Sequence, residues 1–352
     1  MSLSPRIVSA KTWLPRIAAI AFLGCGLTIA AQDTPLFSVG AGFFSDTSGG
    51  LTTLQPAIAP VLVAPLGKYL LVESRGDFRE IYAQNGASNE YHSHFFASMA
   101  FAQLDIIASR HITIVGGKFL VPFGTYNERL TPFWIPNFQG GPLIYGIGTK
   151  PGGAANGGMA RGDLYSNRDV QLSYVVCFSG ASNIHDLQSA RTFGDRISFF
   201  FPRQRLEIGT SYQRYLEQTH LNSEGVHLWW LPYRLPVEVR SDYAHTQTSH
   251  GYWLETAFPL FAGRGGHRLL AGLQPAFRMQ QTFRIAPNIA GEPDGLPAVN
   301  TQEADFGLDY VAHGDMRLNT SYSRSFSANG NKNIWDASLT YRFLFPMWRG
   351  SK

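Results

Sequence analysis

The residues of this sequence that could do chemistry are charged side chains that recur at every second position of extended segments. Glu73, Arg75, Asp77 and Arg79 form the clearest set, and apolar residues such as Phe78 alternate with them. Successive side chains of a β-strand point to opposite faces, so this spacing gathers acids and bases on one face. Such a face could line a polar passage, or its charges could simply pair across strands and stabilise the sheet.

The same alternation recurs along the chain, from segments near Val170 to segments near Tyr322. If the polar faces all point inward, they line one shared lumen that carries both signs of charge in similar number. Transverse fields across that lumen are then expected rather than strong selectivity for one sign. The predicted lumen residues are Glu73, Arg75, Asp77, Arg79, Arg205, Glu207, Glu238, Arg240, Asp242, Asp305, Asp309, Arg317 and Arg342.

Catalytic and metal-binding patterns are weak by comparison. His245 and Ser249 could supply part of a hydrolase site, but a predicted turn separates them. His92 and His94 share a strand face, yet no further metal ligands lie near them in the sequence. Trp253 could stack a sugar, although its alternative is an ordinary wall residue. We therefore predict no catalytic residues, no metal and no cofactor.

These segments must be positioned by strands, and the stretch from Ile334 to Phe345 shows the pattern best. Its odd positions are aromatic or apolar and its even positions are polar. A membrane-spanning barrel needs this alternation on every strand, because one face meets lipid and the other meets water. We predict an all-β fold, a transmembrane antiparallel up-and-down barrel of about 14 to 16 strands. A soluble β-sandwich is the alternative, but it would rarely sustain one charged face over so many strands.

The composition agrees with an exported β-rich protein. Of 352 residues only 15% are charged, whereas 13% are aromatic and 36 residues are glycine. Typical soluble proteins carry about 25% charged residues. The net charge is +4, and Arg6, Lys11 and Arg16 contribute three of these charges, which leaves 4 − 3 = +1 elsewhere. This balance gives no case for a nucleic-acid partner.

The N-terminus, residues 1–31, is predicted to be a signal peptide, followed by one domain over residues 32–352. A basic lead precedes the apolar run from Ile17 to Ile29, and small residues end at Ala31. The run is shorter than the roughly 20 residues that span a bilayer, which disfavours a retained helix. A lipid-attachment site at Cys25 fits poorly because the apolar run continues past it. Cleavage would leave Cys177 as the single cysteine.

One long connection, residues 122–167, interrupts the alternation with many glycines and prolines. Long loops of this kind are usually functional. It could extend outside the barrel or fold into the lumen, and the sequence leaves both possibilities open. Lys118, Glu128 and Arg129 lie at its base, and we predict that they form a constriction.

Two segments resemble a known family. Gly117–Gly124, read as GKFLVPFG, resembles the G-[KR]-F-x-x-P-F-G element of porin-like outer-membrane proteins, distant relatives of the phosphate-selective porins. Leu339–Phe345 resembles the closing strand that the barrel assembly machinery reads. The chain departs from the family by continuing through residues 346–352 and by lacking a ladder of inward lysines. The resemblance supports a porin-like barrel and leaves phosphate in doubt.

The resemblance implies a bacterial outer-membrane porin for passive diffusion of small hydrophilic solutes or ions. Its expected partners are outer-membrane lipid, the barrel assembly machinery, such solutes and further copies of itself in a homo-oligomer. The alternative function is a structural barrel that sheathes or anchors a partner, such as an outer-membrane electron-transfer protein. No Cys-x-x-Cys-His haem motif occurs in the sequence, so any cofactor would have to come from that partner.

Overall fold

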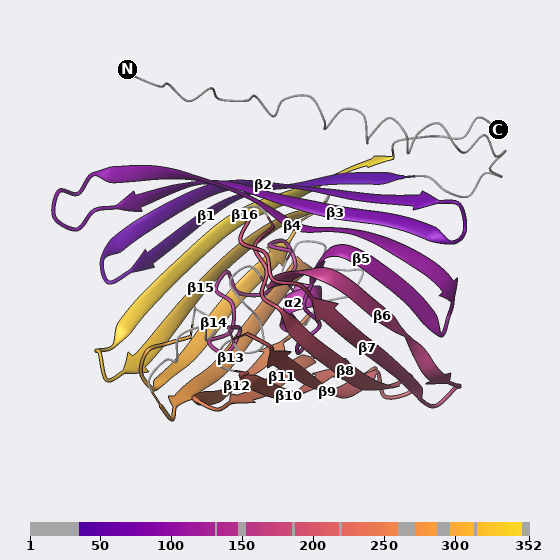
Figure 1. Ribbon diagram of the computed structural model, residues 1–352. Helices are drawn as coiled ribbons and strands as arrows, with labels where there is room; N and C mark the ends of the chain where they lie inside the picture. Colours follow the sequence, from indigo (N-terminus) through magenta and orange to yellow (C-terminus); the bar gives the residue numbers. More distant parts are fainter. Residues whose placement is uncertain are drawn as a thin grey trace, which may run out of the picture. The chain divides into compact units, whose positions relative to one another are not determined.

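A computed structural model describes residues 35–130, 132–146, 153–184, 187–217, 220–259, 272–286, 296–312 and 315–346. The predicted signal peptide and the tail beyond Pro346 lie outside these residues. The described chain forms a closed barrel in which each strand pairs antiparallel with its neighbours in sequence, and β16 pairs with β1 (Figure 1). The predicted all-β barrel of up to sixteen strands is confirmed.

Sixteen strands make the wall. They are β1 Leu36–Ser48, β2 Leu51–Leu66, β3 Leu70–Gln84, β4 Tyr91–Ser109, β5 Ile112–Leu120, β6 Ala154–Ser166, β7 Gln171–Ser179, β8 Thr192–Phe201, β9 Leu206–Tyr215, β10 Asn222–Trp230, β11 Glu238–Thr246, β12 Ser249–Ala257, β13 Leu273–Arg284, β14 Thr301–Val311, β15 Met316–Ser327 and β16 Lys332–Pro346. A short helix, α2 Tyr126–Leu130, follows β5. No helix among the described residues is long and apolar enough to cross a membrane.

The alternation seen in the sequence becomes two faces of one wall. On β14, Phe306 and Leu308 are 57% and 41% exposed, whereas Asp305 and Asp309 on either side of this pair are 0% and 1% exposed. The outward face is apolar and the inward face polar, as a strand between lipid and lumen requires. The barrel closes where Phe37 lies opposite Phe345 and Gly40 opposite Arg342.

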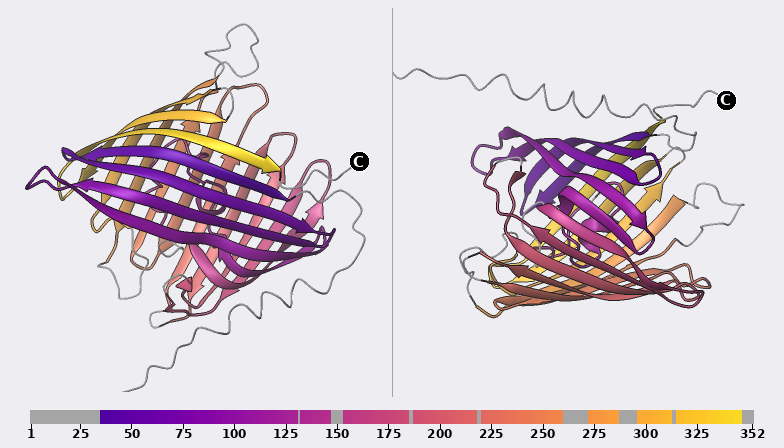
Figure 2. Two further views of the ribbon diagram at one scale, coloured as in Figure 1. Left: turned by 90° about the horizontal axis from the view of Figure 1, so that it is seen from above. Right: turned by 45° about the vertical axis from the view of Figure 1, so that its right-hand side comes forward.

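The wall is uneven in height. Strand β4 has 19 residues and β2 has 16, whereas β7, β10, β11 and β12 have 9 each. Figure 2 shows the long strands β2 to β4, in indigo and purple, on one side of the barrel. One side of the barrel therefore reaches further than the other.

Strand β2 contains three prolines, which disfavour a strand because proline cannot donate a backbone hydrogen bond, yet it forms a complete strand. Its ladder with β1 is continuous, but its ladder with β3 skips Pro56 and Pro60. Pro56 and Pro60 are four residues apart, so their backbone nitrogens both point toward β3. Because proline has no N–H to donate, only the ladder with β3 is interrupted. Pro65 lies beyond Val63, the last residue of β2 that pairs with β1.

The predicted loop over residues 122–167 is wrong in its second half, because β6 begins at Ala154. The alternation of apolar and polar residues does not reveal this strand, because it contains Gly157, Gly158 and Gly162. At Gly157 and Gly162 the backbone of a neighbouring strand also approaches too closely for a side chain. A Cβ on Gly157 would lie 2.1 Å from the Phe178 carbonyl oxygen, and one on Gly162 would lie 2.2 Å from the His111 carbonyl oxygen.

Candidate functional site

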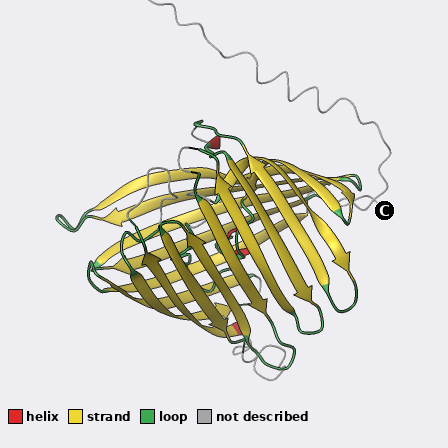
Figure 3. Cartoon of the chain, turned by 60° about the horizontal axis from the view of Figure 1, so that its bottom comes forward, coloured by secondary structure: helices red, strands yellow, loops and turns green. Residues whose placement is uncertain are grey.

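The connection between β5 and β6 runs inside the barrel. We call its described residues, 121–130, 132–146 and 153, the inner loop. Figures 1 and 3 show α2 and the segments beside it within the ring of strands. Four of its apolar residues, Val121, Phe123, Leu130 and Ile144, join the main buried cluster with Trp253 of β12. The question of where this connection lies is settled in favour of the lumen.

The first attachment of the inner loop is to Asp242 of β11. The Thr125 amide and hydroxyl both donate hydrogen bonds to its carboxylate, at 3.3 and 3.1 Å. The Trp253 indole donates to the same group at 3.2 Å. Gly124, at φ +63°, is a left-handed turn position suited to glycine, and its carbonyl accepts from Arg196 at 3.1 Å.

The second attachment is made by the helix α2. Arg129 donates two hydrogen bonds to the Glu207 carboxylate of β9, at 2.8 and 2.7 Å. Its neighbour Glu128 pairs with Arg196 of β8 at 2.5 Å. Burial lowers the pKa of Arg129, but the contact with Glu207 more than offsets this and raises it. Bidentate pairs of this kind fix orientation as well as adding energy.

The third attachment lies further along, at Asn137. Its side chain donates to Glu255 at 2.8 Å and accepts from Gln274 and Arg317 at 2.8 and 3.1 Å. Its carbonyl accepts from Asn319 at 2.7 Å. Asn137 is 1% exposed, so these bonds tie the loop to β12, β13 and β15 with little competition from water.

The loop also reaches the opposite wall. The Trp134 ring lies over Gly40 of β1, where an added Cβ would come within 2.5 Å of it. Arg75 of β3 faces the same ring at 5.6 Å from its centre. Phe133 packs edge-on against Phe44 of β1 at 5.2 Å. The inner loop therefore crosses the lumen. It is attached to β8, β9, β11, β12, β13 and β15 on one side and packs against β1 and β3 on the other.

Beside the loop a cavity of about 460 Å³ remains, which we call the vestibule. It lies toward the barrel end where β1 ends and β16 begins. A much smaller gap of about 10 Å³ lies between the loop and β15 and β16, lined by Arg317 and Thr340. Both spaces border the same four loop residues, Phe133, Pro136, Phe138 and Gln139. Little space is therefore left between these loop residues and strands β15 and β16.

Burial changes the acidity of two loop tyrosines that border the vestibule. Desolvation raises the pKa of Tyr126 to about 12. It also raises the pKa of Tyr145, whose hydroxyl donates to Asn127 at 2.9 Å. The two rings meet edge-on at 5.1 Å. Both phenols are neutral at physiological pH, so they contribute aromatic surface and hydroxyl groups to the vestibule rather than charge.

The structure brings most of the predicted lumen residues to the inner face. Many of them are already paired there. Arg240 contacts Glu238 and Glu255 at 2.7 and 3.3 Å, and Arg317 contacts Asp309 at 2.8 Å. The predicted residues on this face are Glu73, Arg75, Asp77, Arg79, Glu207, Glu238, Arg240, Asp242, Asp305, Asp309 and Arg317. Their effect on transit stays a prediction.

Three predicted residues lie away from the middle of the inner face: Arg205 and Lys118 are off it, and Arg342 is near its end. Arg205 is in the exposed turn between β8 and β9, with Tyr233 at 5.2 Å. Arg342 lies toward the end of β16 and contacts Asp315 at 3.4 Å. Lys118 shares a face of β5 with exposed Ile114, so the register contradicts its expected place in a lumen constriction. Its partners in that prediction, Glu128 and Arg129, do lie inside and hold the loop.

Several inner-face residues escaped the sequence analysis. Arg196, Glu255 and Arg278 are 9%, 4% and 2% exposed, and all three engage the loop. Each occupies an inward position of an alternating strand, so extending the alternation through every segment would have found them. Nothing in the sequence marks Asn137, because its partners come from strands more than 100 positions away.

The alternative chemistries find little support in the geometry. His245 faces outward with His250 opposite it, whereas Ser249 is fully buried on the inner face, so they cannot act as a pair. Trp253 does point inward, but it is 1% exposed and has no face free for a sugar. Among the described residues, no three His, Cys, Asp or Glu side chains gather closely enough to hold a metal.

Comparison with solved structures identifies the architecture. OmpF from Salmonella typhi, in a complex with daunomycin, superposes with a TM-score of 0.59 at 12% identity, covering 88% of this chain and 98% of that one. An anion-selective porin from Comamonas acidovorans gives 0.56 at 10% identity, covering 89% and 100%. The fold is a porin fold. OprB from Pseudomonas putida gives 0.56 at 6% identity, covering 89% and 92%. No protein-family model matches the sequence, and no curated protein is significantly similar to it.

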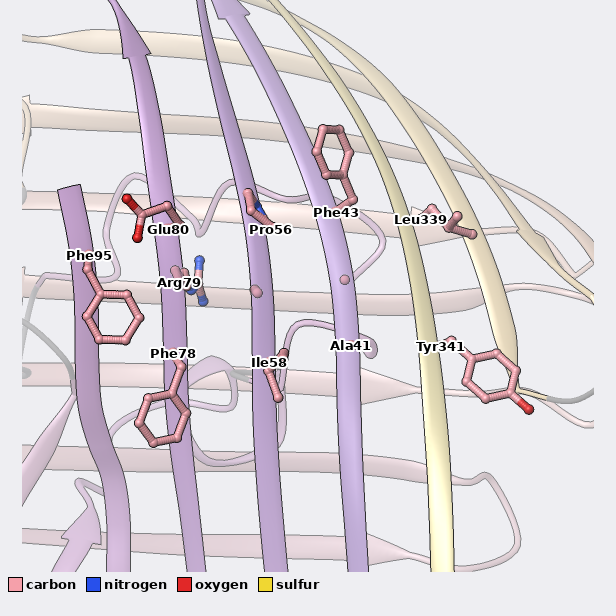
Figure 4. A pocket seen from close by; sticks show the side chains of 12 residues that line it. Ala41, Phe43, Pro56, Ile58, Phe78, Arg79, Glu80, Phe95, Leu339 and Tyr341 are labelled. Atoms are coloured by element: carbon pink, nitrogen blue, oxygen red, sulfur yellow. The ribbon is translucent and has the colours of Figure 1, made fainter. Parts of the chain in front are cut away.

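The outer face of this porin fold carries a shallow apolar groove. It has a volume of about 520 Å³ and crosses the outside of β16, β1, β2, β3 and β4, as Figure 4 shows. Phe43, Ile58, Phe78 and Phe95 are exposed around it, and Glu80 is the acidic residue among its lining. This belt of apolar side chains is the surface that a membrane-spanning barrel turns to lipid.

Proposed function

We propose that the protein is an outer-membrane channel for passive diffusion of small hydrophilic solutes or ions. The observation that carries the proposal is the inner loop, which is fixed to the wall by buried polar contacts and leaves a vestibule beside it. A barrel built only as a sheath would have no need for a loop that narrows its lumen while leaving a polar-lined space. The likeness to porins supports the fold on which this proposal rests.

The barrel wall supports a location in a membrane. Outward positions are apolar on strand after strand, and exposed aromatics such as Trp335, Tyr341 and Phe345 lie along the closing strand β16. Aromatic rings of this kind are favoured near membrane interfaces. We therefore place the barrel in the bacterial outer membrane, surrounded by lipid. The exposed aromatics of β16 fit its recognition by the barrel assembly machinery.

Selection in this channel is expected to act on size first. The narrow gap beside the loop is far smaller than the vestibule, so a solute must fit past Phe133, Phe138 and Arg317. Charge acts second. Most inner arginines already pair with carboxylates, which leaves neither sign dominant along the described wall as a whole.

A liposome-swelling assay with sugars of graded size tests the proposal. Vesicles that contain the refolded full chain should swell with small sugars at a rate that falls steeply as solute size grows. Empty vesicles provide the control. If the folded barrel, verified by its β-sheet circular dichroism, gave no more swelling than empty vesicles with any solute, the channel function would be refuted.

A further inference from the structure

The vestibule has two chemically different walls. One is aromatic, with four side chains from the inner loop and one from β1. These rings are Phe44, Tyr126, Phe133, Phe138 and Tyr145. Phe44 and Phe133 meet edge-on, as do Tyr126 and Tyr145, so the rings form two small clusters. Such surfaces favour flat apolar groups and attract cations to the ring faces.

The other wall is acidic. Asp46 of β1, Asp336 of β16 and Glu303 of β14 all border the vestibule. Asp46 and Asp336 lie directly opposite each other in the pairing of β1 with β16. Like charges directly opposite each other on neighbouring strands destabilise the pair, and a cationic group between them would relieve that repulsion.

None of these three carboxylates has an ion-pair partner among the described residues. Asp336 accepts a hydrogen bond from the Ser321 hydroxyl at 3.2 Å, and Glu303 accepts one from the Gln280 amide at 2.8 Å. These donors are neutral. The carboxylate oxygens of this wall therefore have no fixed cationic partner in the described structure, and a solute cation can supply one.

The two arginines that border the vestibule do not cancel this charge, because each already has its own acid. Arg79 donates two hydrogen bonds to Asp77 at 2.9 and 2.8 Å. Arg278 contacts Asp305 at 2.6 Å, and its charge also lies 4.6 Å from the centre of the Phe138 ring. With these pairs set aside, Asp46, Asp336 and Glu303 are the charged groups of the vestibule lining that lack a partner of opposite sign in the described structure.

We propose that the vestibule binds small aromatic solutes that carry a protonated amine. The ring packs against the loop aromatics, and the ammonium group is held by Asp46, Asp336 and Glu303. The Gln139 amide nitrogen, buried at the same cavity without a hydrogen-bond partner in the described structure, can donate to a further oxygen on the solute. This inference names the solute class of the proposed channel and rests on that function for its access.

Binding of three matched probes tests the proposal. 2-Phenylethylamine, 2-phenylethanol and phenylacetate share one ring and differ in charge. Titration calorimetry on the full chain in detergent should show the amine binding at least about tenfold more tightly than the alcohol, with phenylacetate weakest. Equal binding of the three probes, or preferred binding of phenylacetate, would overturn the proposal.

Variants then locate the site. Asp46→Asn, Asp336→Asn and Glu303→Gln combined should reduce amine binding to the level of the alcohol, and Phe133→Leu should weaken both. Asp169→Asn, in the exposed turn between β6 and β7, is the matched control and should change nothing. Amine preference that survives in the folded triple variant would refute the assignment. If the triple variant does not fold, Asp46→Asn alone must still lower the preference.

The same experiment separates the two proposals. Calorimetry needs no current, so selective amine binding by a barrel that never conducts would refute the channel and leave the binding site standing. A conducting barrel with no amine preference would refute the site alone. In a conducting barrel, 2-phenylethylamine should also interrupt the current in a dose-dependent way that the triple variant lacks.

Discussion

At the scale of single residues, the inner face is governed by the cost of burying charge. Arg278 and Asp305 are 2% and 0% exposed, and their ion pair of 2.6 Å offsets the cost of burying the two charges. Arg278 also donates to the Gly140 carbonyl at 2.9 Å. This ion pair thus belongs to the wall and also positions the loop. Its two charges bind each other and are not free to bind a passing ion.

Arg278→Met should destabilise the protein strongly, because it leaves the Asp305 carboxylate buried without a counter-charge. The expected loss is about 3–5 kcal/mol of unfolding free energy. Urea unfolding in detergent micelles measures it. Adding Asp305→Leu should recover most of the loss, and Arg324→Met, on the outward face, is the control. An unchanged unfolding midpoint for Arg278→Met would contradict this account.

The buried phenol of Tyr126 predicts a dependence on alkaline pH. Its pKa in the folded protein is about 12, against an ordinary value of about 10, so the folded state keeps a proton that the unfolded state loses. The free energy of unfolding should therefore fall as pH rises from about 10 to 12. Tyr126→Phe should make that fall shallower. Unfolding curves at several pH values test this, and an identical slope in both proteins would show that Tyr126 is not the cause.

At the scale of elements, the inner loop and the wall depend on each other. The loop has little regular structure of its own, and α2 is only 5 residues long. Its path is set by side chains of β8, β9, β11, β12, β13 and β15 that receive it. Removing a single attachment should free one arm of the loop and leave the barrel intact.

Asn137→Leu tests this at the third attachment. The substitution leaves Glu255, Gln274 and Arg317 each without one hydrogen-bond partner, at about 1–3 kcal/mol for each buried group left unsatisfied. The loop arm should become accessible to protease added to the refolded protein, while the strands stay protected. Asn333→Leu, at the outward rim of β16, is the control. Equal resistance of both variants would argue against the role of Asn137.

Most of the strands could be predicted from the sequence, because the alternation of apolar and polar residues is a local pattern. Each strand between lipid and water must show it by itself. β14 to β16 follow from it directly. β6 does not follow from alternation, because glycines occupy positions where the backbone of a neighbouring strand leaves no room for a side chain, and glycine marks neither a lipid-facing nor a water-facing position. The path of the inner loop was also out of reach. Its partners Asp242 and Glu255 lie more than 100 positions away, and only the closed barrel brings them together.

At the scale of the whole molecule, the barrel is held by its alternating wall, and the closing strand tests that idea. Phe343 and Phe345 are 42% and 47% exposed on the outward face. Phe343→Asp combined with Phe345→Asp should abolish membrane assembly, because both changes place a carboxyl group on the lipid-facing side. The free-energy cost of each Asp is below the roughly 2–4 kcal/mol of an Arg or Lys at the bilayer midplane, so both substitutions are made together. Arg342→Asp, on the inward face of the same strand, should assemble, as should a chain that lacks residues 347–352. Normal membrane levels of the double variant would contradict a lipid-facing position.

The central claim is that the barrel conducts and that the inner loop sets its narrowest point. Single-channel recording in planar bilayers, on the wild-type chain and on Phe138→Ala, tests it most directly. Phe138 borders both the vestibule and the small gap beside β15 and β16, so its removal widens the narrow section between them. We predict discrete current steps for the wild type and roughly twofold larger steps for Phe138→Ala, because the narrowest section limits conduction. Folded protein that gives no steps in either form, or steps of equal size in both, would contradict the account.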